Sequence, residues 1–190
     1  MFDENYGLES AVLDGTKGMT RRNGNRPNNE YDNYVANCRS VGKEPMTLRE
    51  YAISTSPVLV GDIVAIAQSY RRMGYDPMYC PIGIEDGVGS VPGWSNKMYV
   101  RADLCKRHVK VTGVDYQLLW DITDDDCLKE GIIPVATPHL KKKLHYSFQN
   151  SGKVFETPKK AFEYLIRKMC GDSYWECDPY VYVFTFELID

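Results

Sequence analysis

The run PYVYVFTFELI, from Pro179 to Ile189, is the most strand-like stretch of the chain. Its valine, tyrosine and phenylalanine residues favour extended backbone. Apolar side chains occupy both alternating sets of positions, so neither face of this strand is expected to meet water. We therefore place it at the centre of a sheet, and the rest of the fold has to be assembled around it.

Shorter strand-like segments precede this run. Residues 57–70 predict a turn followed by a strand, and residues 98–122 predict two or three strands. Residues 17–22 look extended. Residues 23–33 predict a loop because Asn, Gly and Pro dominate them, and residues 30–41 predict a polar helix.

Helices are expected to flank these strands. Residues 5–14 carry a partial apolar stripe. Residues 123–131 open with a capping threonine and three aspartates, which suit the positive end of a helix. Residues 157–171 begin with Thr-Pro and end on glycine. Strands and helices do not alternate as in a parallel α/β protein, so we predict a mainly β, α+β fold: a partly closed β-barrel with two or three flanking helices.

Length and composition fit one globular domain, residues 1–190, with loop insertions at about 23–56, 71–96 and 132–156. Hydrophobic residues make up 43% of the chain and charged residues 26%. The formal net charge of −3 argues against a protein whose whole surface binds nucleic acid, but it leaves room for one basic cleft.

Several classes of protein are not indicated. The first residues lack the basic and apolar regions of a signal peptide, and no apolar run reaches the length of a membrane span. The six cysteines form no Cys-x-x-Cys pair, and the three histidines fit no zinc spacing. We therefore expect reduced thiols, a cytoplasmic protein, no metal, no cofactor and no membrane partner. The oligomeric state is left open.

The stretch DGTKGMTRR, Asp14 to Arg22, is the first candidate for chemistry. A lysine in a dry pocket can activate a neighbouring threonine hydroxyl, so Lys17 and Thr20 could form a nucleophilic pair if the chain bends between them. Such a pair needs a carboxylic acid for the leaving group. Glu130 is the candidate, because it sits at a helix end where the dipole disfavours a carboxylate. A solvated basic strand end and an exposed glutamate remain the alternative.

Basic residues interleaved with aromatic ones are the second candidate. They could line a groove that neutralises phosphates and stacks bases, or they could simply solvate loops. The ligand-binding residues we expect there are Arg21, Arg22, Arg101 and Tyr70.

The segment AVLDGTKGMTRR resembles the motif of the ASCH-domain family, Gly-x-Lys-x-x-Thr-x-Arg. Gly15, Lys17, Thr20 and Arg22 fill its four positions. The similarity to bacterial and phage-type members continues through VGDIVAIAQSY, VKVTGVDYQLLWDITDDDCLKEGI and SYWECDPYVYVFTFELI, and it covers roughly half of the chain. Where related proteins often have Arg-Glu before Thr-Trp, this chain has Ala-Gln-Ser-Tyr at 67–70.

The resemblance implies a PUA-like β-barrel that binds RNA, a nucleotide or a modified nucleoside. It also implies a catalytic set of Lys17, Thr20 and Glu130, since some small members are amidohydrolases that deacylate N4-acetylcytidine. Three hypotheses follow: a binding domain for RNA or a nucleotide, an amidohydrolase with Thr20 as nucleophile, and an accessory protein that docks a protein partner.

Overall fold

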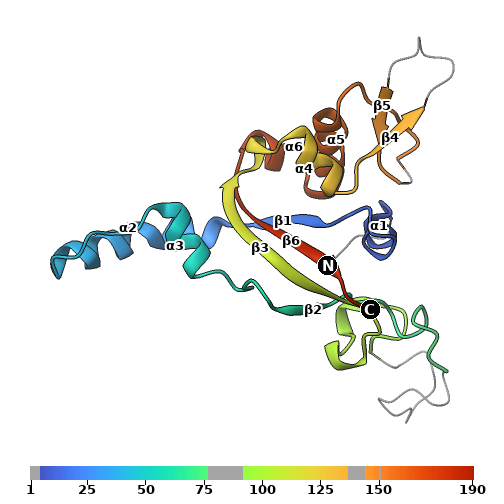
Figure 1. Ribbon diagram of the computed structural model, residues 1–190, viewed down its shortest axis with the longest axis horizontal. Coiled ribbons are helices and arrows are strands. Elements are labelled where there is room, and N and C mark those ends of the chain that lie inside the picture. The colour runs from blue at the N-terminus through green and yellow to red at the C-terminus, as the bar shows by residue number, and fades with distance from the viewer. Residues whose placement is uncertain (1–4, 77–91, 137–143, 150) are drawn as a thin grey trace.

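The computed structural model describes residues 5–76, 92–136, 144–149 and 151–190 (Figure 1). The fold is α+β, with a curled antiparallel sheet that forms a half-barrel. The helices are α1 (Leu8–Leu13), α2 (Asn25–Ser40), α3 (Leu48–Ser54), α4 (Asp124–Lys129), α5 (Pro158–Cys170) and α6 (Asp172–Glu176). The strands are β1 (Met19–Asn23), β2 (Ile63–Ala65), β3 (His108–Leu118), β4 (Ile133–Ala136), β5 (Leu144–Ser147) and β6 (Tyr180–Leu188).

Strand β6 lies inside the main sheet, whose order is β1-β6-β3-β2. The prediction that this run is central and buried is confirmed. Val181 and Val183 pack on one face, which we name the outer face. Tyr182, Phe184 and Phe186 pack on the opposite, inner face. Apolar residues are needed at both the odd-numbered and the even-numbered positions because both faces of this strand are covered.

A bulge in β3 keeps its apolar side chains on the inner face. The register with β6 shifts between Val111 and Gly113. Val109 and Val111 precede the shift and Tyr116 follows it, yet all three pack against inner-face residues of β6. Without the extra residue, the alternation of side chains would turn Tyr116 to the outer face.

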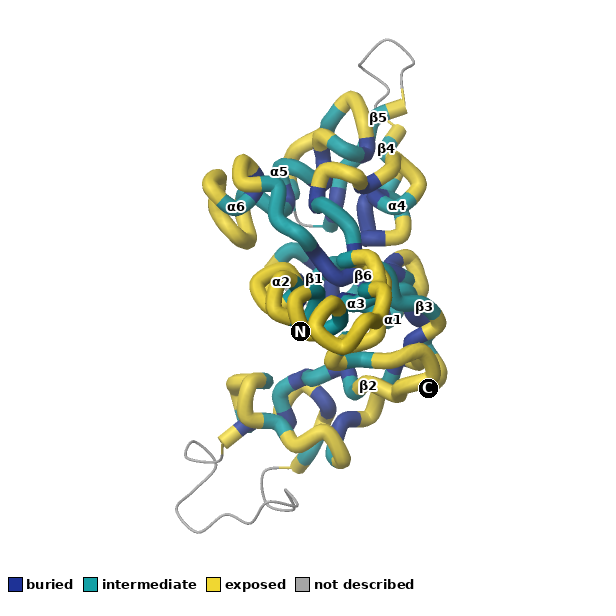
Figure 2. The backbone as a smooth tube through the Cα atoms, turned by 90° about the vertical axis from the view of Figure 1, so that its left-hand side faces the viewer, coloured by how far each residue is buried: buried dark blue, intermediate teal, exposed yellow. Residues whose placement is uncertain are grey.

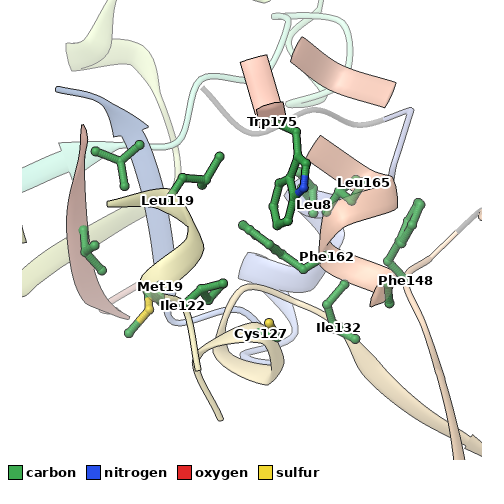
Figure 3. Packing of buried hydrophobic residues seen from close by; sticks show 13 residues of the cluster. Leu8, Met19, Leu119, Ile122, Cys127, Ile132, Phe148, Phe162, Leu165 and Trp175 are labelled. Carbon is green, nitrogen blue, oxygen red and sulfur yellow. The ribbon is translucent and has the colours of Figure 1, made fainter. Parts of the chain in front are cut away.

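The outer face of the sheet packs against α4, α5 and α6 (Figures 1 and 3). The amphipathic helix α5 begins as predicted, with the Thr157 side chain accepting a hydrogen bond from the Lys160 backbone N–H. Its Phe162 and Leu165 meet Trp175 of α6 and Val181 of β6 in the largest core cluster. This core fixes the position of α4, whose last turn forms one side of the site described below.

The segment between β1 and β2 corrects the sequence prediction. Residues 25–33 are helical rather than a loop, because Pro27 lies in the first turn of α2, where its missing N–H costs no hydrogen bond. Helix α2 projects from the body and is largely exposed (Figures 1 and 2). Helix α3 instead packs on the inner face: Ala52 is fully buried, and its carbonyl accepts a hydrogen bond from the Tyr182 hydroxyl.

Other boundaries also differ. Residues 98–122 hold one long strand with short 3-10 turns on either side, instead of two or three strands. In the run 57–70 only Ile63–Ala65 forms a strand. The expected insertion at 132–156 contains the β4–β5 hairpin, and Phe148 after it joins the core. The middle of the expected insertion at 71–96 and the basic run at 141–143 lie outside the described residues.

Substituting Gly24 with alanine is expected to destabilise the fold. A Cβ there would lie 2.5 Å from Cε2 of Tyr116 and 3.0 Å from the Tyr180 carbonyl oxygen. Crowding of this kind costs about 1–3 kcal/mol in the free energy of unfolding. Urea unfolding checks this, with Asn25→Ala on the exposed helix start as control. Equal stability of the two variants would contradict the packing described.

Candidate functional site

Lys17 occupies the short connection between α1 and β1, and three hydrogen bonds fix this connection. The Lys17 backbone N–H donates to the Ala11 carbonyl at 2.8 Å. Gly18 donates to the Lys129 carbonyl at 3.0 Å and accepts from the Phe186 N–H at 2.9 Å. The connection is thereby held between the end of α4 and strand β6, and the Lys17 side chain turns inward, with only 3% of the residue exposed.

The Lys17 ammonium binds Glu130 twice. Its Nζ lies 2.5 Å from the carboxylate Oε2 and 2.8 Å from the backbone carbonyl oxygen of the same residue. Glu130 is the C-cap of α4, so this carbonyl is one that the helix itself leaves unbonded. One cation therefore satisfies the negative helix end and compensates a carboxylate that the dipole disfavours.

Arg21 holds the other side of this carboxylate. Its Nη1 donates to Oε1 of Glu130 at 3.0 Å, and its Nη2 donates to Oδ2 of Asp126 at 3.1 Å. The guanidinium also lies 5.9 Å from the centre of the Phe162 ring. Only 3% of the Arg21 side chain is exposed, and its Nε has no hydrogen-bond partner among the described residues. Lys17 and Arg21 thus fix the Glu130 carboxylate from two sides.

Burial changes the proton affinity of the cations. Desolvation lowers the pKa of Lys17 from its usual value, although the adjacent Glu130 carboxylate acts in the opposite direction. Desolvation also lowers the pKa of Arg22, which feels the same carboxylate. The 2.5 Å contact places the Lys17 ammonium and the Glu130 carboxylate within direct hydrogen-bond reach of each other.

Two cavities meet at β1. A small one of about 40 Å³ is lined by the polar residues Lys17, Thr20, Arg21, Arg22 and Glu130, together with apolar side chains that include Phe162 and Leu165. A larger pocket of about 300 Å³ opens on the inner face of the half-barrel. Its lining comes from all four strands and the segments beside β2: Thr20, Arg22, Val58, Val64, Ala65, Ala67, Val109, Val111, Phe184 and Phe186. Thr20 and Arg22 line both cavities.

The structure brings together five of the seven residues expected at the site: Lys17, Thr20, Arg21, Arg22 and Glu130. It does not bring the other two there. Tyr70 is fully buried in a separate cluster, and its hydroxyl accepts a hydrogen bond from the Arg101 backbone N–H. The Arg101 side chain is exposed and pairs with Asp103 at 2.6 Å.

Sequence reasoning missed the part that Asp126 plays. The sequence assigns Asp126 only to the aspartates that suit the positive end of its helix, yet its carboxylate also accepts a hydrogen bond from Arg21. Its distance of four residues from Glu130, which puts both carboxylates on one helix face, is the signal that could have revealed it. The apolar pocket could not be found in this way, because its walls come from strands that are distant in the sequence.

Comparisons with protein families, with curated proteins and with solved structures find no match to this chain. The resemblance to ASCH domains therefore stays a prediction. In the described part of the chain, no helix has the length and apolar character needed to cross a membrane. Among the same residues, no three His, Cys, Asp or Glu side chains gather as metal ligands would.

Replacing Glu130 with glutamine is expected to lower the free energy of unfolding by about 3–5 kcal/mol, because it leaves two buried cations without their shared carboxylate. Glu163→Gln is the matched control, since its pair with Arg167 is partly exposed and should contribute about 1 kcal/mol or less. Chemical denaturation measures both. Similar losses of unfolding free energy in the two variants would show that the buried cluster contributes no more to stability than a partly exposed ion pair.

Proposed function

We propose that the inner-face pocket binds a nucleobase, presented by a nucleoside, a nucleotide or RNA, in a half-barrel of the PUA-like kind. The observation that carries this proposal is the junction of an apolar pocket of about 300 Å³ with a buried ionic cluster through Thr20 and Arg22. Small-ligand sites are mostly apolar, with a few fixed polar groups that orient the ligand. Aromatic and aliphatic walls suit the faces of a base.

The charges favour a small ligand over a long polyanion. Lys17 and Arg21 are engaged with Glu130 and Asp126, so they do not form an open basic groove. Arg22 lines both cavities and offers one positive charge at the edge of the pocket. A single base with one phosphate or ribose near Arg22 and Thr20 fits this distribution.

Binding of cytidine and cytidine monophosphate, measured by isothermal titration calorimetry, tests this proposal. Loss of a hydrogen bond to a charged group predicts that Arg22→Met weakens the monophosphate by about 10- to 100-fold, and more than the nucleoside. Arg26→Met is the control, because that side chain is 87% exposed on α2. Absence of a heat signal for both cytidine and cytidine monophosphate, or equal affinities of the two variants for the monophosphate, would contradict the proposal.

A second function, hydrolysis of an acylated base amine, is favoured by the contact between Lys17 and Glu130 at 2.5 Å beside Thr20. Passing the ammonium proton to Glu130 yields a neutral amine and a carboxylic acid. The amine then takes the Thr20 hydroxyl proton as the oxygen attacks the acyl carbon, and Glu130 protonates the departing base amine. Water next attacks the threonine ester, gives a proton to the Glu130 carboxylate and releases the acid, while Lys17 returns a proton to Thr20.

Release of acetate from N4-acetylcytidine tests this second function. Thr20→Val, which keeps the size of the side chain but lacks the hydroxyl, should lose activity at least about 100-fold. The rate should fall as pH rises through the lowered pKa of Lys17, because the pair then lacks the proton that the leaving amine needs. Turnover that is unchanged in Thr20→Val, or that keeps rising beyond pH 10.5, would exclude the scheme.

A further inference from the structure

Four charged side chains meet beside α4: the cations of Lys17 and Arg21 and the carboxylates of Glu130 and Asp126. The side chains of the first three are at most 5% exposed, whereas 22% of the Asp126 side chain is exposed. Asp126 therefore lies where the cluster meets solvent. Neither of the functions proposed above gives this carboxylate a part, although it completes the balance of two positive and two negative charges.

The Arg21 guanidinium divides its hydrogen bonds between the two acids. Nη1 donates to Oε1 of Glu130 at 3.0 Å, and Nη2 donates to Oδ2 of Asp126 at 3.1 Å. The two acids are four residues apart, so their carboxylates lie on the same side of α4 and one guanidinium can reach both. Arg21 thus uses one oxygen of Glu130, and the other, Oε2, binds the Lys17 ammonium at 2.5 Å.

This orientation leaves one donor of Arg21 unpaired. Its Nε is buried and has no hydrogen-bond partner among the described residues, which is energetically unfavourable. Arginine pairs most strongly with a carboxylate when two of its N–H groups bind both oxygens. If Nε and one Nη bound both oxygens of Glu130, the unpaired donor would be satisfied. The contact between Nη2 and Asp126 holds Arg21 away from this alternative.

We propose that Asp126 is a positioning residue of the site: by binding Arg21, it restricts this arginine to Oε1 of Glu130 and keeps Oε2 for Lys17. The two cations compete for one carboxylate. Without Asp126, Arg21 takes both oxygens, and Lys17 retains only the backbone carbonyl of Glu130, now at 2.8 Å. For turnover this inference rests on the hydrolysis proposed above, in which Lys17 passes a proton to Glu130, whereas the contact itself can be measured without substrate.

Hydrogen exchange of the Lys17 ammonium tests this proposal. It is followed by NMR of the full ¹⁵N-labelled chain, and its signal is assigned by through-bond correlation along the side chain. In Asp126→Asn the ammonium should exchange about 10- to 100-fold faster, as expected for loss of a hydrogen bond to a charged group. The backbone N–H groups of Lys17 and Gly18 should keep their rates, because their bonds to Ala11 and Lys129 are unaffected.

Two further variants separate positioning from a general effect. Asp125→Asn removes the same charge from an exposed position in the same helical turn and should change none of these rates. Asp126→Glu keeps the carboxylate and should restore most of the ammonium protection. Unchanged ammonium exchange in Asp126→Asn, equal acceleration in Asp125→Asn, or no recovery in Asp126→Glu would contradict the proposal. Equal acceleration of the ammonium and the two backbone N–H groups would also contradict it, since that result indicates a purely structural role.

Couplings across hydrogen bonds in the unsubstituted chain provide a test that needs no variant. With ¹³C and ¹⁵N labels, Lys17 Nζ and Arg21 Nη1 should each couple to the carboxylate carbon of Glu130, and Arg21 Nη2 to that of Asp126. A missing coupling between Arg21 and Asp126 would overturn the proposal. Neither experiment contains a base or a substrate, so its outcome is distinct from that of the binding and turnover assays above.

Discussion

The contact between the Lys17 ammonium and Glu130 is the interaction on which the site depends. It joins the connection before β1 to the last turn of α4, two segments 113 residues apart. Buried ion pairs rarely add stability compared with apolar residues of similar size. Burying a lysine, an arginine and a glutamate beside a pocket therefore carries an unfavourable desolvation free energy. A functional role of these groups explains their burial better than a contribution to stability does.

Strand β1 lies between two compartments of the site, the ionic cluster around this contact and the apolar pocket. Its position at the sheet edge leaves Thr20 and Arg22 beside both cavities, while Arg21, opposite Val183, points to the outer face and to Glu130. The alternation of a single strand thus puts the ionic cluster on one side and the apolar pocket on the other. The bulge in β3 completes the arrangement by keeping Val109, Val111 and Tyr116 on the inner side.

The sequence was sufficient where local chemistry decides the structure. The apolar residues on both faces of β6 predicted that this strand is central. The capping threonines of α4 and α5 predicted where those helices begin. The odd position of Glu130 pointed to the lysine contact. The sequence was insufficient where contacts between distant residues determine the structure. Residues 23–33 look like a loop, but Pro27 is harmless in a first helical turn, and α3 acquires its place from Tyr182. Tyr70 looked available for stacking, but a separate aromatic cluster buries it.

The resemblance to ASCH domains predicts a glutamate at the position of Gln68. The Gln68 amide instead donates a hydrogen bond to Glu9 of α1 at 2.9 Å. Glu9 also pairs with Lys97 at 3.3 Å, so α1, which leads into the site, is anchored through its own acid by two residues from elsewhere in the chain. Whether a glutamine can replace a glutamate at position 68 depends on its packing against Glu9, which no local sequence pattern encodes.

The central claim is that the inner-face pocket holds a base between β1 and β3. Intermolecular nuclear Overhauser effects between cytidine monophosphate and a methyl-labelled chain measure this most directly. The structure predicts contacts from the base protons to the methyl groups of Val64, Val109, Val111 and Thr20, which line the pocket. Contacts only to Ile63 and Val60, which are exposed outside it, or no contacts at a saturating ligand concentration, would contradict the claim.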